Sequence, residues 1–323
     1  MKKLLSVLVL ALALLSCKDS KTSDKILFDS EGKLNDVSVV IGNDNWKGSV
    51  GEAIRDVLAT PIYGLPQDEP TFIINQIPPQ VFSDFITRTR TVLKIELGKP
   101  AGIAFADNVY AKPQKVIVVS GNKQEVIGLL KENASKIIET FKGIELKYKQ
   151  KLTRKSLYNT KVIKDKLGVN IEFQTAYRIA KDDDTFFWIR KDVRTGTLNL
   201  MLYELPYHAI QRNDSIINQI VKIRDSIGKA HIEGPTEGSY MITEYAYTPF
   251  QSEIILDGKP TLETKGLWEV KNAFMSGPYI NYAIEDKANT RWLIAEGFAF
   301  APSVEKRNYI FELESIIKTI RID

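Results

Sequence analysis

A single cysteine, Cys17, stands directly behind the short apolar stretch that opens this chain. With one thiol in 323 residues, no intramolecular disulfide can form, so burial of apolar side chains must stabilise the folded body. The composition supplies those side chains, because 44% of the residues are hydrophobic and 10% are aromatic. A chain of this length is expected to form two domains.

The first sixteen residues are typical of an export signal. Lys2 and Lys3 carry positive charge, and an apolar run from Leu4 to Leu15 follows them. That run has about a dozen residues, whereas a membrane-spanning helix needs about 20. Residues 1–16 are therefore predicted to be a signal peptide that contributes nothing to the fold.

The end of this signal resembles the lipobox of bacterial lipoproteins. Leu14 and Leu15 precede the small Ser16 and then Cys17. In proteins with a lipobox, the cysteine is acylated and becomes the first residue of the mature chain. The resemblance implies attachment of a lipid such as palmitate at Cys17. The alternative is an ordinary signal peptide followed by an incidental cysteine.

Residues 17–35 are predicted to be the lipidated cysteine and a flexible tether, since residues 18–25 contain no hydrophobic side chain. The expected location is the cell envelope, with the outer membrane favoured and either its periplasmic or its surface face open. The membrane is one expected partner, through the lipid. Without Lys2 and Lys3, the basic residues exceed the acidic ones by two, so the charge predicts no binding to nucleic acid.

Residues 36–150 are predicted to form an N-terminal α+β domain. A helix is expected over residues 49–58, where Ser49 and Glu52 form a capping-box pattern. A longer helix is expected over residues 122–141. The remaining predicted elements are a helix that starts at Pro78 and Pro79, and strands over residues 37–42, 71–77, 92–97, 102–110 and 115–120.

Residues 151–323 are predicted to form a C-terminal α+β domain with an antiparallel meander and a terminal helix. The lysine-rich residues 142–166 are expected to be a solvated helix at the boundary. Asp257 and Gly258 predict a tight hairpin turn. The predicted strands are residues 171–179, 185–191, 198–205, 252–256, 261–270, 279–285 and 291–300. The fold class is α+β: two mixed α/β sandwich domains with mostly antiparallel sheets flanked by helices.

Two of these elements have a clear apolar face. In the last strand, alternate residues place Trp292, Ile294, Glu296, Phe298 and Phe300 on one side. A helix that Asn213 and Asp214 begin and Gly228 ends has its face at helical spacing. That face comprises Ile216, Ile217, Ile220, Val221, Arg224 and Ile227.

Three segments carry a resemblance to a known family. They are residues 64–72, GLPQDEPTF, residues 186–190, FFWIR, and residues 296–302, EGFAFAP. Together they resemble a family of Bacteroidetes lipoproteins that is defined only as a domain of unknown function. The resemblance implies an envelope address and a fold, but no activity and no catalytic residue. The C-terminal meander with its closing helix is similar, more distantly, to the sandwich of PsbP and Mog1-like proteins.

The residue inventory narrows the possible chemistry. His208 and His231 are the two histidines, so a zinc site with three histidine ligands is excluded, as is a Cys–His nucleophile pair. Both histidines are expected to be structural or exposed. Asp182 to Asp184 could bind calcium, but an EF-hand uses alternating positions and a later glutamate, so a solvated turn is favoured. We expect no metal and no cofactor.

Two loops are the best candidates for binding a partner. Asn43, Asp44, Asn45 and Trp46 follow a predicted strand, and Trp46 could stack on a sugar or peptide ring. Gln67, Asp68 and Glu69 lie in the proline-rich loop of residues 64–70. Packing and turn formation are the competing explanations for both. They stay candidates because functional residues concentrate on loops braced by a scaffold.

Three classes of function follow. The leading prediction is a lipid-anchored binding or scaffolding protein of the envelope, whose partner is an envelope protein or a polysaccharide. A carboxylate-based hydrolase similar to a glycosidase is one alternative, since it needs two Asp or Glu residues at a suitable separation. A carrier of a small ligand is the other alternative. Its pocket would use the aromatic residues of the meander, Trp268, Phe274, Tyr279, Tyr282 and Trp292.

Overall fold

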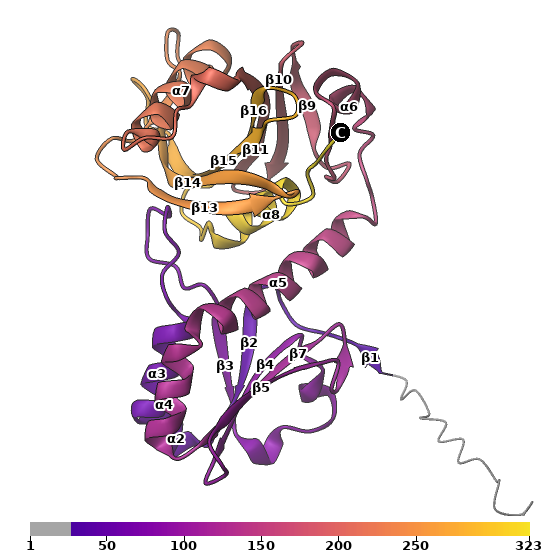
Figure 1. Cartoon of the computed structure of the whole chain (residues 1–323), viewed down its shortest axis with the longest axis vertical. Coiled ribbons are helices and arrows are strands. Elements are labelled where there is room, and N and C mark those ends of the chain that lie inside the picture. The colour runs from indigo at the N-terminus through magenta and orange to yellow at the C-terminus, as the bar shows by residue number, and fades with distance from the viewer. Residues whose placement is uncertain (1–26) are drawn as a thin grey trace, which may run out of the picture.

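The computed structural model describes residues 27–323; the predicted signal peptide and Cys17 lie outside the described residues. It confirms the α+β class, with helices packed on two separate main sheets (Figure 1). We refer to residues 28–153 as the N-terminal half and to residues 154–323 as the C-terminal half. In residues 27–323, no helix combines the length and apolar character needed to cross a membrane.

The sheet of the N-terminal half has five strands in the order β3-β2-β4-β7-β5. The strands are β2 (Asp36–Val40), β3 (Ile73–Ile77), β4 (Thr91–Leu97), β5 (Gly102–Asp107) and β7 (Lys115–Gly121). The predicted antiparallel arrangement does not hold here, because β3, β2, β4 and β7 pair in parallel and β5 alone is antiparallel. Parallel neighbours need long crossover connections: residues 41–72, which contain two helices, connect β2 to β3, and residues 98–114, which contain β5, connect β4 to β7.

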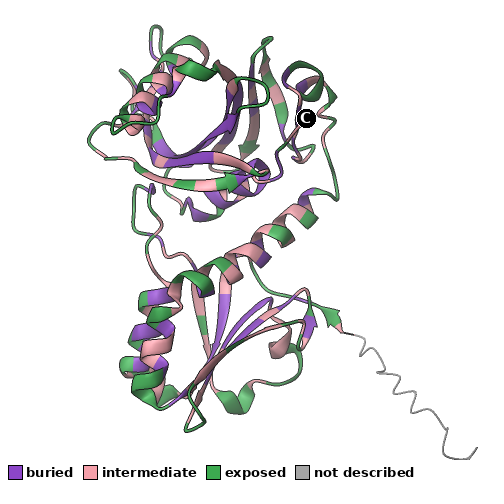
Figure 2. Ribbon diagram, in the orientation of Figure 1, coloured by how far each residue is buried: buried purple, intermediate pink, exposed green. Residues whose placement is uncertain are grey.

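One face of this sheet is covered by helices, and the apolar core lies between them (Figure 2). The helices are α2 (Asn43–Lys47), α3 (Ser49–Leu58), α4 (Lys123–Glu132) and α5 (Ala134–Thr153). The capping box at Asn122 and Glu125 is present at the start of α4. The long predicted helix is two helices, because the Asn133 side chain donates a hydrogen bond to the Leu129 carbonyl and the chain bends there.

On the other face of the sheet, Phe82 packs against Val40, Val92 and Val116, and the helix predicted for its segment, residues 78–90, is wrong. The segment forms two short 3-10 helices, η2 (Pro79–Val81) and η3 (Asp84–Arg88). A left-handed φ of 49° at Asp84 interrupts any regular helix through these residues. Val81 and Phe85 in this segment are 50% and 68% exposed.

The C-terminal half contains an eight-stranded sheet in which all pairs are antiparallel, as predicted. The strand order is β12-β14-β15-β16-β11-β10-β9, with β13 also paired to β14. The strands are β9 (Arg178–Asp182), β10 (Phe186–Val193), β11 (Gly196–Pro206), β12 (Met241–Thr243), β13 (Phe250–Leu256), β14 (Lys259–Val270), β15 (Ser276–Asp286) and β16 (Arg291–Phe300). The predicted turn at Asp257 and Gly258 joins β13 to β14, and both residues have the positive φ that a tight hairpin requires.

Both faces of this curled sheet carry a helix and a core of their own (Figure 1). Helix α7 (Ile216–His231) covers the face that includes Tyr203 and Trp292. Helix α8 (Arg307–Ile317) and α6 (Lys161–Leu167) cover the opposite face. Gly297 lets α8 approach β16, since a Cβ there would lie 2.7 Å from Leu313 Cβ.

Two predictions for this half need correction. Gly228 lies inside α7 instead of ending it, and a Cβ there would lie 2.2 Å from the Met241 carbonyl oxygen, so the glycine permits β12 to pack against the helix. The predicted strand over residues 171–179 is mostly irregular. Its apolar pattern arises because Ile171 and Phe173 are buried in the core as part of a loop.

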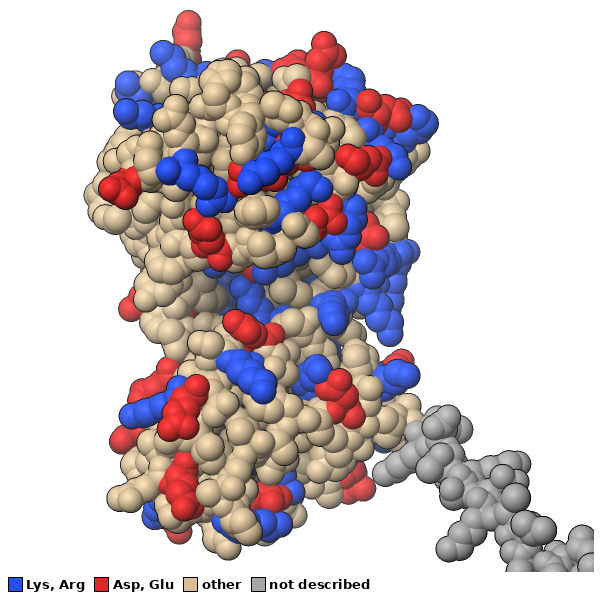
Figure 3. Space-filling model, in the orientation of Figure 1, with Lys and Arg blue, Asp and Glu red and all other residues tan. Residues whose placement is uncertain are grey.

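Helix α5 runs between the two halves, through the predicted boundary at residue 151 (Figure 1). Lys and Arg side chains gather at this waist (Figure 3). They are not all solvated: Lys142 pairs with Glu314 at 2.8 Å, and Lys149 with Glu312 at 2.7 Å. Part of the lysine-rich segment therefore joins the halves through α8.

Candidate functional site

A cleft of about 410 Å³ opens on the α7 face of the eight-stranded sheet. Its floor comes from β10, β11, β14 and β16, and its wall from the chain after α7 and from β12. Aromatic and sulfur-containing side chains dominate the lining. They are Trp188, Trp268, Phe298, Phe300, Met241 and Met275. We call this site the aromatic cleft.

Alternation along the strands brings the aromatic rings together. Phe298 and Phe300 are two residues apart on β16 and therefore face the same side. Trp188 on β10 is half-buried, and its Nε1 donates to Asn199 Oδ1 at 3.1 Å. Trp268 on β14 is buried, and its Nε1 donates to the Ala299 carbonyl at 3.2 Å. Since both indole N–H groups have partners within the chain, the rings offer their apolar surfaces to the cleft.

A glycine on β15 makes room for one of these rings. Gly277 pairs with Trp268 in the register of β14 and β15. A Cβ at Gly277 would lie 3.1 Å from Trp268 Nε1 and 2.0 Å from the Ala299 oxygen. Any larger residue would displace the indole from its hydrogen bond, so Gly277 fixes this wall of the cleft.

Deeper under α7, the same face of the sheet carries a buried ion pair. Arg224 and Glu296 are 1% and 0% exposed, and Arg224 Nε donates to both carboxylate oxygens at 2.8–2.9 Å. Asn281 adds a hydrogen bond to the carboxylate at 2.8 Å, and Thr243 accepts one from the guanidinium at 2.6 Å. The guanidinium carbon lies 3.7 Å from the ring centre of Tyr279, a cation–π contact. Glu296 precedes Phe298 on the same strand face, so this polar cluster adjoins the floor of the cleft.

Several polar atoms of this cluster have no hydrogen-bond partner among the described residues. They are Arg224 Nη2, Tyr203 Oη, Tyr279 Oη and Asn281 Oδ1. Burial raises the pKa of the Tyr279 hydroxyl to about 12 and raises that of Tyr203 further, so both phenols stay protonated as donors. Burial lowers the pKa of Arg224, but the Glu296 carboxylate more than offsets this and the pKa is raised.

Two charged side chains of opposite sign complete the lining of the cleft. Arg190 on β10 contacts Asp192, with Nε 3.2 Å from the carboxylate. Glu233 lies just after α7 and is the one carboxylate among the described residues that line the cleft. The arrangement can hold a flat apolar group against the rings and orient it through a few polar contacts, as ligand sites commonly do.

The first predicted binding segment lies away from this cleft. Asn43 and Asp44 are exposed on the short helix α2, not on an open turn. Trp46 is half-buried against the core of the N-terminal half, and the Arg55 guanidinium lies 4.7 Å from its ring centre. Asn45 is also half-buried. The binding role of these residues stays a prediction, and Trp46 packs against the core of the N-terminal half.

The second predicted segment lies at the other end of the N-terminal sheet. Helix α2 follows the carboxyl end of β2, whereas residues 64–70 precede the amino end of the parallel neighbour β3. The structure therefore does not bring the two segments together. Gln67 and Asp68 are exposed. Glu69 is 4% exposed, and its carboxylate accepts hydrogen bonds from the backbone N–H groups of Lys306 and Arg307 at 2.7 and 2.8 Å.

The five aromatic residues predicted to line a carrier pocket do not lie together in one pocket. Trp268 lines the aromatic cleft, and Tyr279 lies in the polar cluster beside it. Trp292 is buried elsewhere on the α7 face, with its Nε1 bonded to the Tyr207 carbonyl. Tyr282 points to the opposite face, and Phe274 is fully exposed.

The histidines and the aspartate turn lie apart from the cleft lining. His208 is exposed, and the His231 ring stacks on Phe186 with 4.0 Å between ring centres. Asp182 pairs with Lys166 at 2.9 Å. Within residues 27–323, no three His, Cys, Asp or Glu side chains gather as a metal-ion site would require.

Sequence reasoning missed most of the cleft. Trp188 appeared only inside a segment that resembles a family, and Met241 and Met275 gave no signal. The one pattern that indicated part of the cleft was the apolar side of the last strand, where Phe298 and Phe300 occupy alternate positions. The other walls come from segments far apart in the sequence.

Comparisons with solved structures give distant likenesses. The Ran-binding protein Mog1p of Saccharomyces cerevisiae has a TM-score of 0.31 at 7% identity, over 48% of this chain and 89% of that one. LpqN of Mycobacterium tuberculosis, described as involved in cell envelope biogenesis, has a TM-score of 0.29 at 10% identity, over 48% of this chain and 82% of that one. At these scores neither likeness bears on function.

Comparisons of sequence are more direct. No curated protein matches the chain. Residues 30–154 match a domain of unknown function, DUF8532. Residues 156–319, just over half of the chain, match a second domain of unknown function, DUF4837. The chain therefore belongs to the DUF4837 family.

Proposed function

We propose that this protein is a lipid-anchored binding protein of the cell envelope that holds a small, mainly apolar ligand in the aromatic cleft. The observation that carries the proposal is the cleft itself, about 410 Å³ in volume and walled by Trp188, Trp268, Phe298 and Phe300. Its volume is within the range of about 300–1,000 Å³ found for small-molecule sites. The envelope location rests on the signal-like residues 1–16 and on Cys17.

The scaffold suits a binding site. Three of the four strands under the cleft, β10, β11 and β16, pair continuously, so the rings on β10 and β16 stand on a rigid surface. Rigid aromatic rings provide contact area at small entropic cost. Arg190 and Glu233 at the lining can select the orientation of a ligand that carries a polar group.

The hydrolase alternative has less support from this site. A glycosidase of the usual kind needs two carboxyl groups about 5–9 Å apart. Glu233 is the single carboxylate among the described lining residues, and Glu296 is bound to Arg224 beneath the floor. Binding of an envelope protein or polysaccharide through the exposed loops remains the second candidate, favoured by the exposed Asn43, Asp44, Gln67 and Asp68.

The test uses the full chain with Cys17→Ala, so that no attached lipid competes for the cleft. Titration with N-phenyl-1-naphthylamine, a neutral aromatic probe, should change its fluorescence in a saturable way. Trp188→Ala removes a wall of the cleft and should weaken binding about thirtyfold, the effect of about 2 kcal/mol. Trp46→Phe, in the other half of the molecule, is the matched control and should bind like the parent.

Two results would overturn the proposal. One is equal affinity of the Trp188→Ala and Trp46→Phe variants for the probe. The other is saturable binding of envelope oligosaccharides together with no binding of the aromatic probe, which would favour the polysaccharide candidate.

A further inference from the structure

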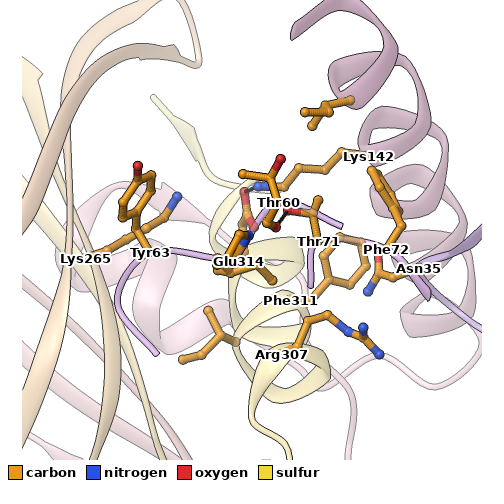
Figure 4. A pocket seen from close by; sticks show the side chains of 14 residues that line it. Asn35, Thr60, Tyr63, Thr71, Phe72, Lys142, Lys265, Arg307, Phe311 and Glu314 are labelled. Carbon is orange, nitrogen blue, oxygen red and sulfur yellow. Dashed lines mark hydrogen bonds and ion pairs between the residues drawn. The ribbon is translucent and has the colours of Figure 1, made fainter. Parts of the chain in front are cut away.

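A second cavity, of about 230 Å³, lies where the two halves of the molecule meet (Figure 4). We call it the joint cavity. Residues 60–63 and 71–72 contribute from the N-terminal half, together with α5. Strand β14 and helix α8 contribute from the C-terminal half. None of its lining residues belongs to the aromatic cleft.

The walls of the joint cavity are mainly apolar. Phe72 is 1% exposed and belongs to the core of the N-terminal half, while Ile310 and Phe311 come from α8. Ile62 and Ile138 close the remaining sides. A purely apolar space of this size would simply favour an apolar guest.

Charged side chains make the cavity amphipathic. Lys142, Lys265 and Arg307 line it, against one carboxylate, that of Glu314 (Figure 4). Glu314 is already shared, because Lys142 and Lys318 both lie 2.8 Å from its Oε1. Burial raises the pKa of Glu314, but the neighbouring lysines more than offset this, so the pKa is lowered and the group stays ionised between them.

The remaining two cations differ in their pairing, because Lys265 has a carboxylate partner of its own, whereas Arg307 has no carboxylate of the described residues within hydrogen-bond distance. Lys265 contacts Glu263 at 2.6 Å. Arg307 is 4% exposed, and its Nη1 donates to the Pro70 carbonyl at 3.2 Å. Its Nη2 lies 3.9 Å from Glu305, beyond hydrogen-bond distance. A buried guanidinium with unused donors favours a carboxylate, whose planar geometry matches its own.

We propose that the joint cavity binds a small amphipathic carboxylate, with its apolar body against Phe72, Ile138 and Phe311 and its anionic head on the guanidinium of Arg307. A dry cavity of about 150 Å³ accommodates benzene, so one of this size takes roughly nine non-hydrogen atoms. Octanoate has about that size. Because residues of both halves line the cavity, the ligand fastens the halves together, and its binding stabilises the folded chain by mass action.

The experiment compares three ligands that share an eight-carbon chain and differ in the head group: octanoate, 1-octanol and octylammonium. The protein is the full chain with Cys17→Ala, and the readout is the dissociation constant from calorimetry together with the melting temperature. Octanoate should bind at least tenfold more tightly than octanol and should raise the melting temperature. Octylammonium should do neither. Equal binding of all three would overturn the proposal.

Variants locate the site. Ile138→Phe fills the cavity and should weaken octanoate binding at least tenfold, while Ile138→Val, which enlarges it, should retain binding. If Ile138→Phe fails to fold, Ile62→Phe fills the same space from another segment of the N-terminal half. Trp188→Ala should leave octanoate binding unchanged, which separates this site from the aromatic cleft. Octanoate binding that survives filling of the cavity, or that is lost with Trp188→Ala, would overturn the proposal.

Discussion

Arg224 on α7 and Glu296 on β16, 72 residues apart in the sequence, form an ion pair that is almost wholly removed from solvent. The pair ties the helix to the sheet beside the floor of the aromatic cleft. Both charges lost their hydration on folding, and the hydrogen bonds from Asn281 and to Thr243 compensate for part of that loss. Breaking the pair on one side leaves a buried charge without its counterion.

We therefore expect Glu296→Gln to lower the free energy of unfolding by about 3–5 kcal/mol. Arg224→Met should cost a similar amount, and the double variant Arg224→Met/Glu296→Leu should cost much less than the sum, because it leaves neither charge unpaired. Urea denaturation measures all three. Arg178→Met, which breaks the exposed pair with Asp192, is the control and should cost at most about 1 kcal/mol. Additive losses in the double variant would contradict this explanation.

The sequence indicated that Arg224 and Glu296 each face a core, but it did not indicate that they form an ion pair with each other. Glu296 interrupts the apolar side of the last strand, and Arg224 interrupts the apolar face of a helix. Periodicity correctly places both side chains toward the core. Periodicity does not predict that α7 packs on the face of β16 that carries Glu296. That contact depends on the order of the strands in the sheet, which periodicity does not reveal.

Because local sequence patterns do not reveal tertiary packing, several other predictions also differ from the structure. Strands of the N-terminal half were predicted within a few residues, but their parallel pairing depends on how the connecting segments cross the sheet. The segment after Pro78 has helical spacing of apolar residues, yet Asp84 takes a left-handed conformation that propensity did not reveal. The aromatic cleft was missed for a related reason, since its walls come from five strands and the loops beside them, which only the tertiary fold assembles.

Glu69 fixes the loop of residues 60–71 to the start of α8. Its two carboxylate oxygens accept separate backbone N–H groups, those of Lys306 and Arg307. Glu69→Gln keeps the size but removes the charge and one acceptor, so we expect a loss of about 1–2 kcal/mol in stability. Limited proteolysis should then cut the loop faster. Asp68→Asn, at the exposed neighbouring position, should change neither quantity, and a stable, protease-resistant Glu69→Gln protein would contradict the assigned role.

His231 makes stability depend on pH. Burial against Phe186 and the nearby Lys181 lower its pKa below the ordinary value of 6.5, with Asp183 opposing them. The unfolded chain therefore takes up a proton at a higher pH than the folded chain does. The stability that neutral His231 contributes is present above about pH 6.5 and is lost as the pH falls through the lowered pKa.

The comparison variant is His231→Phe, which retains the stacking on Phe186 and cannot titrate. Between pH 7.5 and 5, the parent should lose stability relative to this variant, in denaturation experiments at fixed temperature. Carboxylates change both proteins alike, so the difference between the curves isolates the histidine. Parallel curves over this range would mean that His231 titrates equally in both states.

Trp46 is expected to act mainly through packing. Its ring lies between the core of the N-terminal half and the Arg55 guanidinium. Trp46→Ala should lower the free energy of unfolding by about 2 kcal/mol, less than the 3–5 kcal/mol of a fully buried tryptophan because the ring is half-buried. Trp46→Phe should cost much less. An alanine variant of unchanged stability that no longer captures an envelope partner in a crosslinking pulldown would instead favour the predicted binding role of residues 43–46.

The lipid anchor gives the last prediction. If Cys17 carries the lipid, Cys17→Ala removes the only acylation site that the signal-like segment offers, and nothing in residues 27–323 replaces it as a membrane-spanning helix. Stable attachment takes more than one acyl chain or an added membrane-binding surface, so complete loss of acylation should shift the protein from the membrane fraction to the soluble fraction or leave the signal peptide uncleaved. Metabolic labelling with a palmitate analogue should disappear in the same variant. Cys17→Ser is the matched control for side-chain size and should behave like Cys17→Ala. Label that persists in either variant would show that the lipid, if there is one, is attached elsewhere.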